Sequence, residues 1–191
     1  MTSKFRFLFN GQSMATLLLA LASSAAWASP AISIRFHGES TLHGFDGHVE
    51  TAEIRIEDSP QGLRRLVTTV SVPAMTTDHA GRDRRMVEMF HGASFPLITG
   101  SALAADLAAV EEGGDLPLEL VIGGQTNTVT ATCRMVPVEG AAEHELSFPV
   151  SLRAFDLKAP SVIGVIRVSD TVDVTARLNA EAWSMVKEGA R

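Results

Sequence analysis

Apolar and polar residues alternate along most of this chain, and this period of two constrains the fold more than any other feature. Between residues 31 and 37, for example, Ile32, Ile34 and Phe36 alternate with polar neighbours. Such alternation is typical of β-strands that bury one face. Alternating or Val/Leu/Ile/Thr-rich runs predict eight strands, at 31–37, 48–57, 66–72, 95–103, 116–122, 127–136, 145–152 and 171–178, with a ninth short candidate at 161–168.

Turn-forming residues separate several of these runs, at 58–62, 112–115 and 123–125. Short strands joined by such turns predict an all-β sandwich or barrel, and the lack of long helical patterns argues against a parallel βαβ fold. We predict an eight-stranded antiparallel barrel, because closure removes the sheet edges and leaves room for one small ligand. An outer-membrane barrel would need aromatic girdles, but residues 29–191 contain no Tyr and a single Trp, Trp183.

One segment breaks the alternation. From residue 81 to residue 91, Met86, Val87 and Phe90 recur at helical spacing among charged residues. This pattern predicts a short helix between the third and fourth strands. Residues 179–191 are polar and helix-prone, and they form either a docked terminal helix or a frayed tail.

The first residues are typical of an export signal. Lys4 and Arg6 form a cationic start, an uncharged apolar run covers 14–22, and Ala26 and Ala28 suit a signal-peptidase site. The apolar run is shorter than the roughly 20 residues that span a bilayer, although an uncleaved anchor is the alternative. We predict a cleaved signal peptide at 1–28, a single domain at 29–191, a periplasmic location and no stable membrane anchor.

Cleavage would change the charge balance. The leader holds two of the sixteen basic residues and none of the twenty-two acidic ones, so fourteen basic residues remain and the net charge is −8 with neutral His. A nucleic-acid partner is not expected, because no stripe rich in Lys or Arg is present. Cys133 is the only cysteine, which excludes an internal disulfide. It is in step with apolar residues, which predicts a buried thiol, with pairing between chains or a reactive thiol as alternatives.

Residues that could carry catalysis or bind a metal do not form recognisable arrays. The six histidines show no His-x-His or His-Glu-x-x-His spacing. No Gly-x-Ser-x-Gly elbow occurs, and the spacing of Ser40 and His43 is common by chance. We therefore predict a binding protein without catalytic residues, metal site or cofactor other than a bound lipid. A weak metal site on the histidines is an alternative.

Four stretches of sequence form a set: 38–47 (GESTLHGFDG), 76–83 (TTDHAGRD) with Met89, Phe90 and 95–98 (FPLI), 120–129 (LVIGGQTNTV), and Phe155-Asp156 with 172–174 (VDV). Together they span nearly all of 31–178, and they resemble the YceI-like family of polyisoprenoid-binding periplasmic proteins. The second stretch is the most specific, since it resembles the family's T…RD…F…P.I block. The third departs from the family at 124–127, where apolar residues and a second Gly are usual.

The resemblance implies a lipocalin-like barrel that encloses a long isoprenoid lipid, either polyprenyl or quinone-like. The candidate ligand-binding residues are Thr77, His79, Arg82, Asp83, Phe90, Phe95, Phe148 and Phe155. Only six Phe lie outside the leader, which predicts a pocket that is narrower or filled by its own aliphatic side chains. If it is filled, the protein is a non-catalytic structural or stress-related module. We expect a monomer or homodimer.

Two interpretations of Arg82 and Asp83 stay open. In the first, the pair pins the start of the helix, because Asp in the first turn favours the helix dipole and Arg82 can bond to loop carbonyls. In the second, Arg82 lies at the pocket mouth and holds a pyrophosphate or a quinone oxygen.

Overall fold

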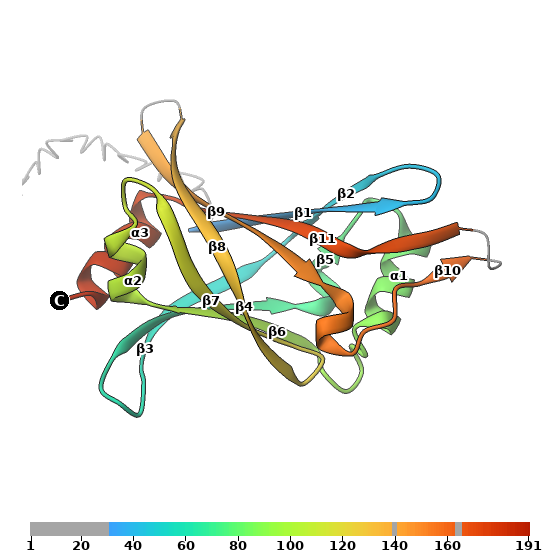
Figure 1. The fold of residues 1–191 in the computed structure, drawn as a ribbon, viewed down its shortest axis with the longest axis horizontal. Helices are drawn as coiled ribbons and strands as arrows, with labels where there is room; N and C mark the ends of the chain where they lie inside the picture. Colours follow the sequence, from blue (N-terminus) through green and yellow to red (C-terminus); the bar gives the residue numbers. More distant parts are fainter. Residues whose placement is uncertain (1–30, 139–140, 163–165) are drawn as a thin grey trace, which may run out of the picture.

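The computed structural model describes residues 31–138, 141–162 and 166–191, so the predicted signal peptide lies outside the described residues. These ranges form strands and a few short helices (Figure 1). The strands are β1 (Ile32–Ser40), β2 (Phe45–Val49), β3 (Ala52–Asp58), β4 (Arg64–Ser71), β5 (Met75–Thr76), β6 (Leu97–Leu103), β7 (Gly114–Ile122), β8 (Gln125–Val138), β9 (Ala141–Ser151), β10 (Ser161–Val162) and β11 (Ile166–Leu178). The helices are α1 (Ala80–Met89), α2 (Ala104–Ala109) and α3 (Ala180–Gly189), with 3-10 turns η1 (Val72–Ala74) and η2 (Leu152–Phe155).

The strands form one antiparallel sheet in the order β3-β4-β6-β7-β8-β9-β11-β1-β2-β5, and β10 pairs with β11 beside this path. The backbone passes from one end of this order to the other in two places: β2 leads into β3, and β4 leads into β5. Figure 1 shows that the sheet curls around on itself. The all-β antiparallel prediction is confirmed, but the predicted closure into a barrel needs correction: in the described residues the end strands β3 and β5 do not pair with each other, so the sheet is curled and keeps two edges.

The predicted count of eight strands and the predicted place of the helix need correction. The structure divides the described chain into eleven strands. The predicted strand 48–57 is interrupted at 50–51 and becomes β2 and β3. The predicted strand 66–72 ends at η1, where Pro73 cannot donate a backbone hydrogen bond to a neighbouring strand, and the short strand β5 that follows was not predicted. Helix α1 consequently follows the fifth strand rather than the third. Helix α2 was not predicted.

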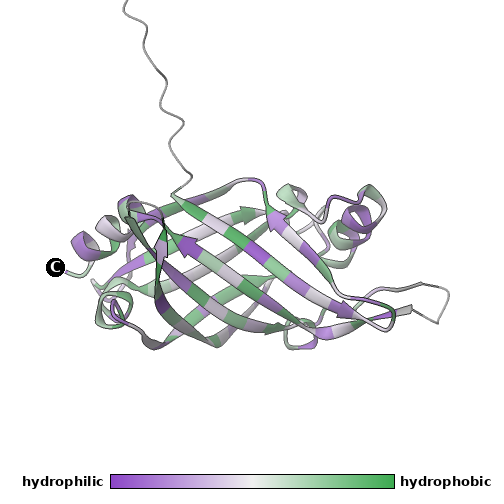
Figure 2. Ribbon diagram, turned by 90° about the horizontal axis from the view of Figure 1, so that it is seen from above, coloured by the Kyte–Doolittle hydropathy of each residue, from purple (hydrophilic) through white to green (hydrophobic). Residues whose placement is uncertain are grey.

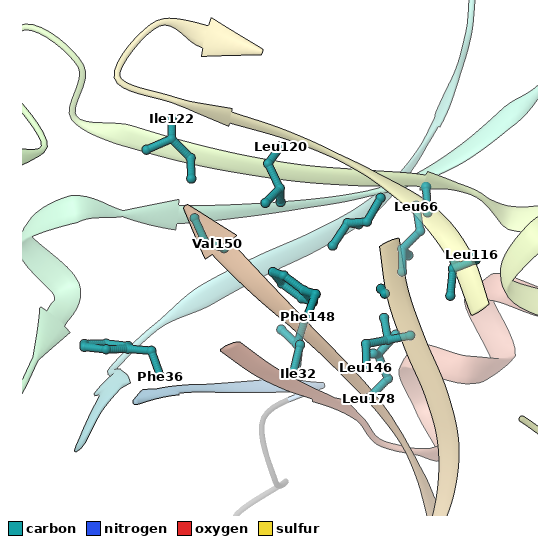
Figure 3. Packing of buried hydrophobic residues seen from close by; sticks show 14 of the residues in the cluster. Ile32, Phe36, Leu66, Leu116, Leu120, Ile122, Leu146, Phe148, Val150 and Leu178 are labelled. Carbon is teal, nitrogen blue, oxygen red and sulfur yellow. The ribbon is translucent and has the colours of Figure 1, made fainter. Parts of the chain in front are cut away.

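Alternation along the strands produces a single apolar interior. On β7, Leu116, Leu118, Leu120 and Ile122 are buried, and the residues between them are more exposed. Figure 2 shows this alternation as bands along the strands, and Figure 3 shows the buried side chains that converge between them.

Cys133 on β8 is 1% exposed, which confirms the predicted buried thiol, and burial raises its pKa.

Different elements cover the two ends of the curled sheet. Helices α2 and α3 lie together at one end, and α1, β10 and the β1–β2 turn lie at the other (Figure 1). The terminal helix is docked rather than frayed: the Asn179 side chain accepts a hydrogen bond from the Ala182 amide at its start, and Trp183 and Val186 are buried. Helices α2 and α3 thus cover one end of the apolar interior.

Candidate functional site

A cavity of about 370 Å³ lies inside the curled sheet. Its wall is formed by side chains of most strands, with α1 at one end and α2 at the other. Nearly all of these side chains are aliphatic or aromatic, and Figure 3 shows Ile32, Leu120 and Phe148 pointing into the same interior. Concave sites of this kind, apolar with a few polar groups, are typical of small-molecule binding.

The charged and titratable side chains of the cavity wall gather at the α1 end. They are His43 from the β1–β2 turn and His79, Arg82 and Arg85 from α1 and its N-cap. Among the described residues that line the cavity, none is Asp or Glu. The wall therefore offers cationic and neutral donors to a ligand at this end, and apolar contacts elsewhere.

Arg82 is held in place by an aromatic ring rather than by a carboxylate. Its guanidinium carbon lies 5.0 Å from the centroid of the Phe45 ring, within the range of a cation–π contact. The Phe45 ring in turn lies against Gly38, where a Cβ atom would come within 2.5 Å of it. In the part of the chain that the structure describes, neither Arg82 nor Arg85 forms a salt bridge. Both charges are available to a ligand.

Asp83 fastens the start of α1 to the preceding loop. Its carboxylate accepts hydrogen bonds from the Thr77 hydroxyl (2.6 Å), the Thr77 amide (2.8 Å) and the Thr76 hydroxyl (2.9 Å). Burial by itself raises the pKa of Asp83, but the hydrogen bonds from Thr77 and Thr76 outweigh it, and the pKa is lowered. His79 caps the helix, because its Nδ1 accepts a hydrogen bond from the Arg82 amide at 3.3 Å.

The structure brings half of the predicted ligand-binding residues to the cavity. His79, Arg82, Phe90 and Phe148 line it. Thr77 and Asp83 do not, because they bond to each other beneath the start of α1. They lie outside the cavity wall, and their predicted part in ligand binding stays a prediction.

Two predicted aromatic residues also lie outside the cavity wall. Phe95 precedes β6, is 41% exposed and rests against Gly124 of the β7–β8 turn. Phe155 lies past the end of β9 in η2, where it is buried in the core without lining the cavity. Neither residue belongs to a strand, so the alternation that orients strand side chains does not orient these rings.

Several wall residues were missed. Phe36 is in step with Ile32 and Ile34, so the alternation contained the signal for it. Met86 also lines the cavity, and its helical spacing indicates the helix but not that the side chain faces the interior. Leu107 of α2 lines the opposite end, and no pattern in its neighbourhood indicated this.

The described residues add two observations about metal sites and membrane spans. No group of three or more His, Cys, Asp or Glu side chains is placed to hold a metal ion within these ranges. His37 does bond to Asp46 (2.8 Å) and Glu39 (3.1 Å), but on an exposed surface. No helix in the described ranges is long and apolar enough to cross a bilayer.

Comparison with known proteins supports one family. Solved structures with the same fold include BcnA of Burkholderia cenocepacia, which is 15% identical with a TM-score of 0.61 over 78% of this chain and 96% of that one. A polyisoprenoid-binding domain from Saccharophagus degradans, implicated in plant cell wall breakdown, is 16% identical with a TM-score of 0.59 over 78% and 93%. A YceI protein of Campylobacter jejuni is 16% identical with a TM-score of 0.51 over 70% and 82%.

At sequence identities of 15–16%, these solved structures show only that the fold is shared. No curated protein matches the chain significantly. The sequence profile of the YceI-like domain, however, matches residues 23–180, which is most of the chain. The chain therefore belongs to the YceI-like family.

Proposed function

We propose that this protein is an exported, non-catalytic carrier that holds an isoprenoid-type lipid inside its curled sheet. The observation that carries the proposal is the apolar cavity of about 370 Å³, in which the charged donors of the described wall all lie at one end. That arrangement suits an amphiphile with its tail inside and its head near Arg82 and Arg85. The polyisoprenoid-binding name of the Saccharophagus degradans domain and the family membership agree with it.

The binding energy is consistent with a tail of several isoprene units. One unit has five carbons, which contribute about 4 kcal/mol when buried, at ~0.8 kcal/mol per carbon. Association costs on the order of 4–15 kcal/mol. Three units or more are therefore needed for useful affinity, whatever the head group.

The main alternative, a structural or stress-related module with a filled core, is disfavoured by the cavity. A filled interior would leave no connected space of this size between Leu120, Phe148 and the facing strands. A catalytic role finds no support, because the described residues that line the cavity include no carboxylate to act with its histidines. Export to the periplasm rests on the leader, and a monomer or homodimer remains our expectation.

The test uses the protein purified natively from its producing cells. Mass spectrometry of an organic extract should find an isoprenoid lipid, and the delipidated protein should regain thermal stability when a prenyl alcohol is added. A ligand that binds only the native state raises stability by mass action. A folded protein that is stabilised by no isoprenoid, quinone or fatty acid would contradict the proposal.

A further inference from the structure

We propose that Thr68 is a second recognition point inside the cavity, which selects a ligand with a hydroxyl or carbonyl oxygen part-way along its chain. The inference rests on the proposed function and makes the ligand class more specific: an oxygenated lipid instead of one with a plain hydrocarbon tail. Such a ligand has two polar groups, a head near Arg82 and a second oxygen deeper inside.

Thr68 lies on the inner face of β4, between two aliphatic residues. Leu66, Thr68 and Val70 alternate along the strand, and all three line the cavity. Strand β4 ends at Ser71, next to η1, which contacts α1. Thr68 is three residues from that end, or about 10 Å along the strand. Its side chain is therefore a polar member of the wall in an otherwise aliphatic stretch, some way inside the α1 end.

The other polar side chains of the described cavity wall are either at the α1 end or already engaged. Those at the α1 end are Ser40, His43, His79, Arg82 and Arg85. Ser101 on β6 donates a hydrogen bond to Glu119 (3.4 Å) and accepts one from Arg65 (2.7 Å). The Thr68 hydroxyl, in contrast, forms no hydrogen bond within the ranges that the structure describes. It is free to bond to a ligand.

A hydroxyl without a partner in an apolar wall discriminates between ligands. When a hydrocarbon tail fills the cavity, water leaves the Thr68 hydroxyl, and a buried hydroxyl without a partner is unfavourable. A ligand oxygen at the same depth removes this penalty, because a threonine hydroxyl both donates and accepts hydrogen bonds. Sites with a buried polar group reject ligands that leave that group unpaired. The wall therefore favours an oxygenated chain.

Gly100 provides space for such an oxygen beside Thr68. The two residues are paired directly across β4 and β6, so they lie on the same face of the sheet. Gly100 is paired in turn with Leu120 on β7. A Cβ atom at Gly100 would lie 3.4 Å from the Leu120 side chain, which is an ordinary van der Waals distance. Close packing therefore does not require glycine here, and its missing side chain widens the cavity at the depth of Thr68.

The experiment uses a prenyl alcohol of four isoprene units and analogues that carry one additional hydroxyl, on each unit in turn. Isothermal titration measures their affinities for delipidated wild-type protein and for Thr68→Val, in which a methyl group replaces the hydroxyl at nearly the same volume. For a hydroxyl on the second or third unit, Thr68→Val should lower the affinity ratio of analogue to parent alcohol by about tenfold or more. For a hydroxyl on the last unit, the ratio should change less than about twofold.

Two further variants control for the substitution itself. Thr68→Ser keeps the hydroxyl and should keep the wild-type ratios. Thr128→Val makes the same chemical change at an exposed position on β8 that does not line the cavity, and it should also leave the ratios unchanged. A Thr68→Ser protein that behaves like Thr68→Val would show that packing, not the hydroxyl, causes the effect, and would overturn the proposal.

Gly100→Ala tests the position of the second oxygen independently. The added methyl group occupies the space beside Thr68, so the analogue with the internal hydroxyl should lose at least about fivefold more affinity than the parent alcohol. Equal losses for the two ligands would show that Gly100 sets only the width of the cavity, and would overturn the position assigned to the oxygen.

Failure of this inference and failure of the proposed function give different results. If neither the prenyl alcohol nor any analogue binds the folded protein, the lipid-carrier function is overturned. If all of them bind but the ratios are the same in wild type and Thr68→Val, the carrier function stands and the role of Thr68 is overturned. Ratios that fall equally for hydroxyls on every unit would also overturn it, because a direct contact acts at one depth.

Discussion

His144 of β9 and Trp183 of α3 stack face to face, with ring centroids 3.5 Å apart and ring planes 5° from parallel. Both side chains are buried, and neither ring nitrogen of His144 has a hydrogen-bond partner among the described residues. Burial lowers the pKa of His144; the charge of Glu111 opposes this shift and that of Lys187 adds to it. The contact between the terminal helix and the sheet therefore depends on a neutral imidazole.

This stack predicts a loss of stability in mild acid. The pKa of His144 lies below its ordinary value of 6.5 in the folded protein, so between the two values the unfolded chain binds more protons. The free energy of unfolding should fall as pH is lowered from about 6.5 and level off below the folded-state pKa. His144→Phe keeps an aromatic ring in the stack but does not titrate. Urea unfolding from pH 7.5 to pH 5 should show a smaller acid loss in this variant.

A control variant at His37 is needed because the titration of His37 changes the pH dependence of stability in the opposite direction to that of His144. Its hydrogen bonds to Asp46 and Glu39 raise its pKa, so its contribution is present at low pH and is lost as pH rises through the folded-state pKa. His37→Gln should therefore steepen the acid loss or leave it unchanged. An equal pH dependence in wild type and His144→Phe would contradict the role assigned to the stack.

We predict that the Asp83–Thr77 contact contributes to the free energy of unfolding independently of Arg82. Asp83→Ala removes the acceptor of three hydrogen bonds and should lower the free energy of unfolding by ~1–2 kcal/mol. Thr77→Val should cost a similar amount, and the double variant little more than either, because the two residues share one network. Combined with Arg82→Ala, by contrast, Asp83→Ala should be closer to additive. An unchanged melting temperature in Asp83→Ala would refute this.

We predict that the Glu145 carboxylate also stabilises the folded protein, from the outer face of the sheet. It is 2% exposed and bonds to Arg177 on β11 at 2.7 Å and to Arg134 on β8 at 2.7 Å. Burial alone raises its pKa, but the hydrogen bonds to Arg177 and Arg134 outweigh burial and lower it. Glu145→Gln should cost ~1.5–3 kcal/mol at neutral pH. Glu53→Gln, at an exposed position on β3, should change stability by less than ~0.5 kcal/mol.

How far the sequence predicts this structure depends on whether a residue lies in a strand. Alternation orients Phe36 and Phe148 correctly, because successive strand side chains point to opposite faces. It fails for Phe95 and Phe155, which lie just outside β6 and β9.

Leu107 is unpredictable for a different reason. Its helix, α2, has six residues, and a helix that short is stable only through packing, here against α3. The partner is far away in the sequence, so no local pattern indicates it. The Arg82–Asp83 pair shows the same limit: the sequence places both at the start of α1, but only the geometry assigns Asp83 to Thr77 and Arg82 to Phe45.

The leader predicts a specific mature end. If the signal peptide is cleaved after Ala28, protein recovered from the periplasm should begin at Ser29. Intact-mass measurement decides this directly. Ala28→Leu, which spoils the small residue at the cleavage position, should leave the chain uncleaved. Recovery of full-length wild-type chain in the membrane fraction would show that the leader acts as an anchor.

We predict that replacing Arg82 weakens ligand binding by an amount that depends on the charge of the ligand's head group. Its guanidinium lies at the mouth of the cavity over Phe45, without a salt bridge in the described chain, so an anionic head could bond to it. Arg82→Ala should weaken a prenyl phosphate by ~1.5–3 kcal/mol, the range of a charge-assisted hydrogen bond. It should weaken the matching prenyl alcohol much less. Isothermal titration with the two ligands measures the difference.

Arg84 supplies the matched control for this comparison. It lies two residues further along α1, is exposed and does not line the cavity, so Arg84→Ala removes the same charge from the same helix. Long-range attraction would be lost in both variants, but a direct contact only in Arg82→Ala. Equal losses in the two variants would mean that Arg82 acts only through its net charge. Equal losses for phosphate and alcohol in Arg82→Ala would mean that Arg82 supports the cavity mouth through Phe45 instead of holding the head group.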